Sequence, residues 1–98
     1  MRYRIVINSF KCKKTEALCK FGTVERKFST FSRAAELRLR YLEAAQDLND
    51  LYFPPSNRFK ALHGDRDGQY SIRVNDKFRI CFNWSELGAE NVEIVDYH

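Results

Sequence analysis

YSIRVNDKFRICFNW, at residues 70–84, alternates apolar and polar side chains on both sides of Asn75-Asp76. A period of two is typical of β-strands that bury one face. A two-residue loop can join such strands into a hairpin, although Asn-Gly or Asp-Gly would be a stronger signal than Asn-Asp. We therefore predict a β-hairpin here. Its core face is formed by Tyr70, Ile72, Val74, Phe78, Ile80 and Phe82.

The opposite face of this hairpin carries two arginines. Because successive side chains of a strand point to opposite faces, Arg73 and Arg79 must both lie on the face away from the core. Two guanidinium groups there would form a fork-like site suited to phosphate oxygens. The alternative is that both are ordinary solvated strand residues.

The C-terminal residues concentrate side chains that handle protons. A strand-like run, Val92–Val95, leads directly to Asp96, Tyr97 and His98. Histidine titrates near neutral pH and is the commonest general acid or base. Chain ends usually fray, so the alternative is a tail that happens to end in histidine.

Upstream of the hairpin the apolar period changes to that of a helix. One helix is predicted from about Phe31 to Leu48 and is followed by Pro54-Pro55, which stops helical geometry. A shorter helix is predicted at Lys14–Phe21, ended by Gly22. The remaining predicted strands are Tyr3–Ile7 and Arg58–Leu62, the latter leading through His63 into a polar turn at residues 64–68. The expected architecture is a single α+β domain over residues 1–98, in the order β-α-α-β-β-β, with an antiparallel sheet packed on two N-terminal helices.

Charge is distributed unevenly along the 98 residues. All 17 Lys and Arg residues lie in residues 1–79, and the net charge is +4. A basic domain suggests a polyanion partner such as nucleic acid, although a merely soluble basic protein or an anionic membrane surface would also fit the charge. No apolar run approaches the roughly 20 residues of a membrane-spanning helix, and no signal peptide is visible. We therefore expect a cytoplasmic protein without a membrane partner.

The three cysteines do not predict a disulfide framework or a metal site. An odd number of cysteines without a secretory signal indicates reduced thiols, and Cys12, Cys19 and Cys81 lack the paired short spacings of a zinc site. There is also no carboxylate cluster for a metal and no glycine-rich phosphate loop. We expect no metal and no cofactor.

The polar residues gathered on the predicted sheet face are those needed to cut RNA without a metal. Lys60 can join Arg73 and Arg79 if the register of the preceding strand allows it, and His63 lies at the end of that strand. A base would take the proton of a ribose 2′-hydroxyl, and the resulting oxygen would attack the adjacent phosphorus. Cations would stabilise the transition state, and an acid would protonate the departing 5′-oxygen. We expect the terminal Asp96, Tyr97 and His98 to meet these cations.

Four motifs carry a resemblance to a known family. They are Leu62-His63-Gly64-Asp65, the run Tyr70–Asn75, Phe78-Arg79-Ile80 and Val95-Asp96-Tyr97-His98. Together they resemble the HigB branch of the RelE superfamily, toxins of bacterial type II toxin–antitoxin modules once described as plasmid maintenance killer proteins. The resemblance implies a compact RelE-type fold and a ribosome-dependent mRNA endonuclease that acts in the A site and inhibits translation and growth. It also implies a helix-turn-helix antitoxin that neutralises the toxin and represses their shared operon, so that operator DNA is bound only through the antitoxin.

The same resemblance implies roles for individual residues. Asp96, Tyr97 and His98 match the C-terminal active-site residues of the family, and Arg79 matches the arginine that follows an aromatic residue in the hairpin. Lys60 and His63 fall where some relatives have a histidine and then a lysine, so either of the two could take part in proton transfer.

Our hypothesis makes His98 the general acid or base, oriented by Asp96, with His63 as its partner in proton transfer. Tyr97 would stack on a base or donate its hydroxyl. Substrate phosphate would be held by Arg79 together with Lys60, Arg73 and Arg58. The alternatives are a non-catalytic basic module that binds RNA or the ribosome, and a purely structural or partner-binding protein.

Overall fold

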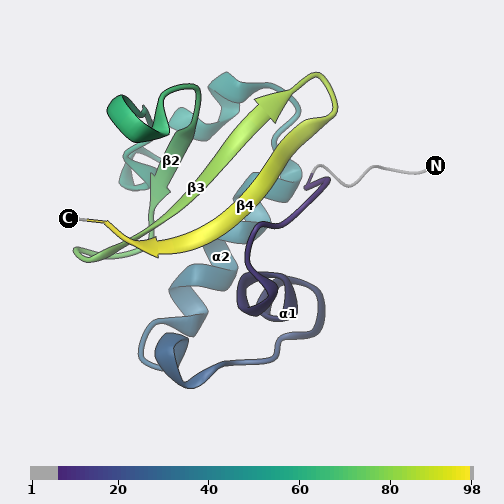
Figure 1. Ribbon diagram of the computed structural model, residues 1–98, viewed down its shortest axis with the longest axis vertical. Coiled ribbons are helices and arrows are strands. Elements are labelled where there is room, and N and C mark those ends of the chain that lie inside the picture. Colours follow the sequence, from purple (N-terminus) through teal and green to yellow (C-terminus); the bar gives the residue numbers. More distant parts are fainter. Residues whose placement is uncertain (1–6, 98) are drawn as a thin grey trace.

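Two helices and a four-stranded antiparallel sheet make up the computed structural model, which describes residues 7–97 (Figure 1). The strands lie in the order β1-β2-β3-β4, and α2 packs behind the sheet in the view of Figure 1. The predicted α+β class is confirmed. The elements are α1 (Lys13–Phe21), α2 (Ser32–Ala44), β1 (Lys60–Ala61), β2 (Tyr70–Arg73), β3 (Phe78–Ser85) and β4 (Gly88–Asp96), with 3₁₀ turns η1 (Arg26–Phe28), η2 (Leu48–Tyr52), η3 (Pro55–Asn57) and η4 (Gly64–Arg66).

The first predicted strand, Tyr3–Ile7, lies outside the described residues except for Ile7. From Ile7 onward the chain runs alongside β4, with isolated parallel bridges from Ile7 to Ala89 and from Phe10 to Val92. The N–H of Lys11 donates to the carbonyl of Val92 at 3.0 Å, which continues this pairing. The N-terminal segment therefore covers the outer edge of β4.

The second helix is shorter than predicted. It ends at Ala44, whereas the apolar spacing continues to Leu48. Asp47 interrupts it, because its side chain accepts a hydrogen bond from the N–H of Asn49 at 2.8 Å and thereby caps a new turn, η2. The side chain of Asp50 accepts in return from the N–H of Asp47 at 3.2 Å, which completes a capping box. Local capping thus outweighs the helical period at this point.

The hairpin forms with the predicted alternation. Ile72 lies opposite Ile80, Arg73 lies opposite Arg79, and both isoleucines are fully buried. The connecting loop covers residues 74–77 and is longer than the two residues predicted. The carbonyl oxygen of the Asn75 side chain accepts from the N–H of Lys77 at 2.9 Å and from that of Phe78 at 2.8 Å, which stabilises the wider turn.

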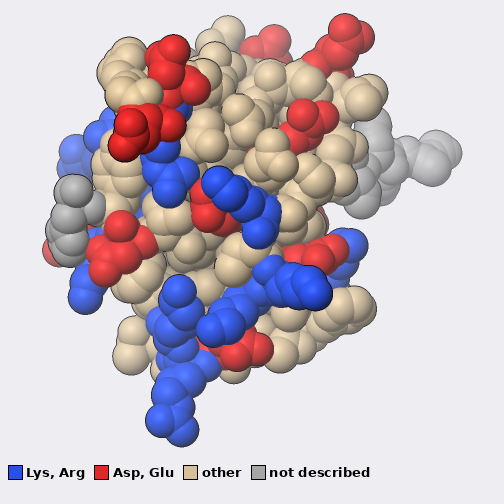
Figure 2. Space-filling view, in the orientation of Figure 1, with Lys and Arg blue, Asp and Glu red and all other residues tan. Residues whose placement is uncertain are grey.

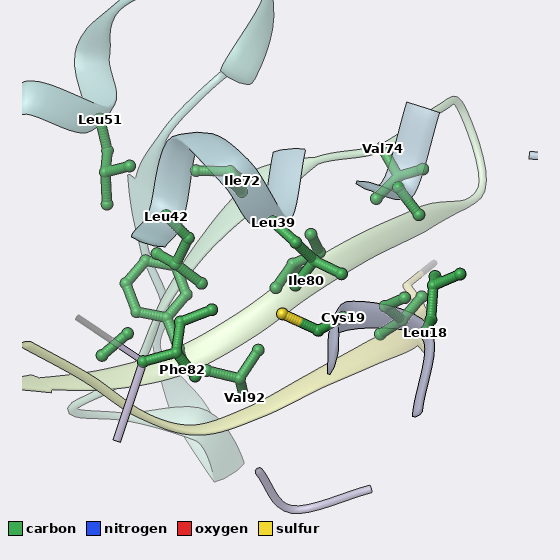
Figure 3. Close-up of a cluster of buried hydrophobic side chains, with 14 of the residues drawn as sticks. Leu18, Cys19, Leu39, Leu42, Leu51, Ile72, Val74, Ile80, Phe82 and Val92 are labelled. Carbon is green, nitrogen blue, oxygen red and sulfur yellow. The ribbon is translucent and has the colours of Figure 1, made fainter. Parts of the chain in front are cut away.

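The main core lies between the helices and one face of the sheet (Figure 3). Leucines of α1 and α2 meet apolar side chains of the strands there, and Phe31 stacks on Phe78 with ring centroids 4.4 Å apart. No helix in the described part of the chain is long and apolar enough to cross a membrane. The buried side chains labelled in Figure 3 include Leu18, Leu39, Leu42, Ile72, Ile80, Phe82 and Val92.

Candidate functional site

Arg73 and Arg79 lie directly opposite each other on neighbouring strands. Ile72 and Ile80, the adjacent pair in the same register, are fully buried in the core. Side chains directly opposite in an antiparallel pair share a face, and adjacent pairs alternate between faces. The prediction that both arginines lie on the face away from the core is therefore confirmed.

Arg79 is held in place by two hydrogen bonds. Its Nε donates to Oγ of Ser71 at 2.7 Å, and its Nη2 donates to the carbonyl oxygen of Arg58 at 2.5 Å. Burial lowers the pKa of Arg79, and the positive charges of Arg73 and Arg58 lower it further. Arginine nevertheless stays protonated at neutral pH, so Arg79 is a partly desolvated, oriented cation. A charge in this setting attracts an anion more strongly than a fully solvated one does.

Two more cations lie beside Arg79. The side chain of Arg73 donates to Asp76, whose own side chain is 99% exposed, so an incoming phosphate can compete for it. Arg58 is exposed and adopts a left-handed backbone conformation with φ of +44°, which turns the chain into β1.

Lys60 and Tyr97 meet across the sheet. Lys60 pairs with Ser71 on β2, which places it on the face of Arg79. Its Nζ lies 5.3 Å from the centroid of the Tyr97 ring, within the range of a cation–π interaction. The backbone N–H of Tyr97 donates to the carbonyl of Lys77 at 2.8 Å, so the residue stays tied to the sheet beyond the end of β4. We call Arg58, Lys60, Arg73 and Arg79 the cationic cluster, and Tyr97 borders it.

Asp96 does not lie with the cationic cluster, contrary to our expectation. It is paired with Phe78, whose ring packs on Phe31 at the start of α2. Strand alternation therefore places the Asp96 carboxylate on the helical side of the sheet, where one of its oxygens lies 3.9 Å from Nζ of Lys77. The expectation failed because consecutive strand residues cannot share a face.

Of the two predicted histidines, His63 is the one that lies among the described residues. His98 lies outside the described residues. His63 precedes η4 and is exposed, and within residues 7–97 no hydrogen bond, ion pair or ring contact joins it to Arg79. In the same range, no group of three or more His, Cys, Asp or Glu side chains is placed to hold a metal ion.

An ion pair between Arg66 and Glu93, which was not predicted, covers the middle of the same sheet face. Nη1 of Arg66 donates to Oε2 of Glu93 at 3.1 Å and to Oε1 of Gln69 at 3.0 Å. Although burial opposes it, the hydrogen bond to Glu93 raises the pKa of Arg66. Glu93 lies opposite Cys81, which is fully buried, so Arg66 reaches over this part of the sheet. The cationic cluster is thereby confined to the end of the sheet that carries the C-terminus.

A second cation also approaches Glu93 on this face. Nζ of Lys11 lies 3.7 Å from Oε2 of Glu93. Figure 2 shows basic side chains spread over this face and over α1, with acidic side chains between them. Basic side chains are therefore widespread on this face, but in the cationic cluster one of them, Arg79, is also held in a fixed orientation by hydrogen bonds.

Ser71, which accepts a hydrogen bond from Arg79, was not among the predicted site residues. Alternation could have placed Ser71 on the arginine face, but only the register shows which residue it faces. Arg66 and Glu93 are 27 residues apart in the sequence, so no local sequence pattern could predict that they pair.

The sequence of the chain is similar to a described protein family and to curated bacterial proteins. A family model described as "RelE-like toxin of type II toxin-antitoxin system HigB" matches residues 8–98. Toxin HigB-1 of Vibrio cholerae is 45% identical over 63 residues, which are 64% of this chain and 66% of that protein. An uncharacterized protein of Haemophilus influenzae is 31% identical over 55 residues, 56% of this chain and 54% of that protein. The chain thus spans less than two thirds of the length of these curated relatives.

Two solved structures share the fold. The YoeB–YefM complex from Staphylococcus aureus has a TM-score of 0.61 at 18% identity, and the YoeB dimer from the same organism has a TM-score of 0.60 at 15% identity. Each comparison covers 98% of this chain and 99% of the other.

Proposed function

The chain belongs to the HigB-like family of RelE-like toxins of type II toxin–antitoxin systems, and from this premise we propose that it is an mRNA endonuclease. It would cleave mRNA in the ribosomal A site by attack of the ribose 2′-hydroxyl, and so inhibit translation and growth. The observation that carries the proposal is the cationic cluster around Arg79.

The cluster suits the charge that develops during this reaction. As the 2′-oxygen attacks, negative charge builds up on the phosphate oxygens, and fixed cations stabilise it. Arg79 is the best placed of them, because its bonds to Ser71 and to the Arg58 carbonyl hold the guanidinium plane before substrate arrives. Arg73 and Lys60 would bind the same phosphate or its neighbours.

Proton transfer requires further groups. We assign the general acid or base to His98, and its partner to His63 or Lys60. Tyr97 would stack on a base or donate its hydroxyl at the border of the cationic cluster. Asp96 would act by orienting His98 and not by contacting phosphate, because its carboxylate lies on the other side of the sheet from Arg79 and there does not cancel the positive charge of the cluster.

The partner we propose is a helix-turn-helix antitoxin that neutralises the toxin and binds operator DNA. The family is defined by toxin–antitoxin systems, and one structural neighbour is the YoeB–YefM complex. Growth arrest on expression of the chain alone, relieved by coexpression of the antitoxin, is the expected result.

The test of the nuclease is cleavage of a defined mRNA on purified ribosomes, with 5′ ends mapped. Wild-type chain should create new 5′-hydroxyl ends, and Arg79→Gln should cleave about 10²–10³-fold more slowly. Arg33→Gln is the matched control, because Arg33 is an exposed arginine of α2. Arrest of translation without new ends would indicate a non-catalytic binding module. Equal rates for Arg79→Gln and the wild type would refute the assignment of the site.

A further inference from the structure

One row of side chains crosses all four strands on the face that carries the cationic cluster. Lys60 of β1 pairs with Ser71 of β2, which pairs with Cys81 of β3. Cys81 in turn pairs with Glu93 of β4. Directly opposite residues share a face, and Ser71 is the residue that accepts from Nε of Arg79. Glu93 therefore lies on the same face as Arg79, in the neighbouring row.

Arg66 reaches over this row from η4, which stands beside the start of β2 in Figure 1. Its Nη1 donates to Oε2 of Glu93 at 3.1 Å. Burial is the largest influence on the pKa of Arg66 and of Arg79 and lowers both, whereas the Cys81 thiol and the Tyr97 phenol act on both in the opposite direction. The two guanidinium groups thus share neighbours, and Arg66 lies over the row next to the cationic cluster.

The guanidinium group of Arg66 has donors to spare. Arginine has five N–H donors, and both hydrogen bonds that Arg66 makes, to Glu93 and to Oε1 of Gln69, come from Nη1. Among residues 7–97, no acceptor is bound to its Nε or Nη2, and its side chain is 31% exposed. An anion can therefore bind Arg66 without displacing Glu93. Because Arg66 is already held by two acceptors, such an anion would lose little conformational entropy in ordering it.

Glu93 has two opposing effects on anion binding at this place. Its carboxylate fixes Arg66, and the same oxygen, Oε2, lies 3.7 Å from Nζ of Lys11. Its negative charge also repels any phosphate that approaches these two cations. Glu93 therefore orients Arg66 for an anion and at the same time lowers the affinity for that anion.

The spacing along the sheet suits consecutive phosphates of one RNA strand. Residues two apart on a strand face the same side and are separated by about 7 Å, so the row of Glu93 lies one such step from Arg79. With the scissile phosphate at Arg79, the next phosphate is one nucleotide away, and an extended single strand can span one step of the sheet. A cation placed over the neighbouring row can then meet it.

We propose that Arg66 binds the phosphate next to the scissile one through Nε and Nη2, and that Glu93 is a positioning residue that holds Arg66 for it. The proposal rests on the proposed function and adds a second phosphate subsite to it. Contacts to phosphate carry no sequence information, so this subsite would strengthen binding without selecting a codon.

The test is the affinity of the chain for a single-stranded RNA of about 12 nucleotides, made resistant to cleavage by 2′-O-methylation and measured from about 50 to 200 mM salt. Arg66→Gln should weaken binding about tenfold. It should also make the slope of log affinity against log salt shallower by about 0.7, the loss of one phosphate contact on a single strand. Arg66→Lys keeps the charge and should keep the slope. Arg33→Gln, at an exposed arginine of α2, is the matched control and should change neither quantity.

Glu93→Gln separates phosphate binding from a purely structural ion pair. The glutamine keeps an acceptor for Arg66 but removes the negative charge, so RNA should bind about threefold more tightly. A structural pair predicts no gain in affinity from this change. Each variant is first checked for folding by circular dichroism, and if Arg66→Gln does not fold, Arg66→Lys and Glu93→Gln decide the question.

Four results would overturn the proposal. They are a wild type without affinity for the RNA, an unchanged salt slope for Arg66→Gln, a Glu93→Gln variant that does not bind more tightly, and a loss of antitoxin affinity with unchanged RNA affinity. The last result would assign Arg66 to a protein partner. The proposed nuclease is read separately, from cleavage by Arg79→Gln on ribosomes.

Discussion

Replacing Ser71 with alanine removes the acceptor that orients Arg79. Ser71 is fully buried, and the bond from Nε of Arg79 to its Oγ is 2.7 Å long. Hydrogen bonds to charged groups contribute about 1.5–3 kcal/mol, and a buried donor left without a partner costs a similar amount. Because Arg79 is only partly buried, water can replace some of this interaction. We therefore expect Ser71→Ala to lower the free energy of unfolding by about 1–2 kcal/mol.

The same change should slow mRNA cleavage. Arg79 keeps its charge and its bond to the Arg58 carbonyl, so the loss should be smaller than that of Arg79→Gln. If about 1.4 kcal/mol of transition-state stabilisation is lost, the rate falls about tenfold.

Urea unfolding and ribosomal cleavage measure the two effects. Ser56→Ala is the control, since Ser56 is an exposed serine that accepts from Nη1 of Arg38 at 3.2 Å, and its loss should change stability by no more than about 0.5 kcal/mol. If Ser71→Ala matches Ser56→Ala in both assays, the bond does not position Arg79.

Two further predictions concern stability. Burial and the carboxylate of Glu43 raise the pKa of Cys19 to about 12 from its ordinary value of 9.0, so the folded state holds the thiol proton more tightly than the unfolded chain. This contribution to the free energy of unfolding is complete below about pH 9, and it is lost at up to about 1.4 kcal/mol per pH unit as the pH rises toward 12. In urea unfolding, the stability of Cys19→Ala should therefore fall less steeply with alkaline pH than that of the wild type. Parallel pH dependences of the two proteins would contradict the prediction. Glu93→Gln removes the charge that pairs with Arg66 at 3.1 Å and Lys11 at 3.7 Å, and it should lower the free energy of unfolding by about 1–2 kcal/mol. An unchanged urea midpoint would mean that these pairs contribute nothing.

The hairpin and its arginines could be predicted from the sequence because alternation is a local property. Once Ile72 and Ile80 are taken as core residues, Arg73 and Arg79 must lie on the other face. The fold class followed in the same way from the change of period between the two halves of the chain.

Other parts of the site depend on contacts that no local pattern contains. Asp96 lies away from the cluster because the register of β4 pairs it with Phe78. Ser71 and the Arg58 carbonyl become partners of Arg79 only through strand pairing and the turn before β1. The end of α2 was predicted too late for a different reason. The helical spacing of apolar residues continues beyond Ala44, but the capping box of Asp47 and Asp50 starts a new turn there.

The flanks of the sheet have a consequence for self-association. β1, at one flank, has only two residues, one of them a lysine, and β4, at the other, is accompanied by residues 7–11. A long unpaired flank would offer a second molecule a template for adding its own strand, which is a common route to fibres. The described part of this protein would thus offer a second copy little unpaired backbone on which to add a strand.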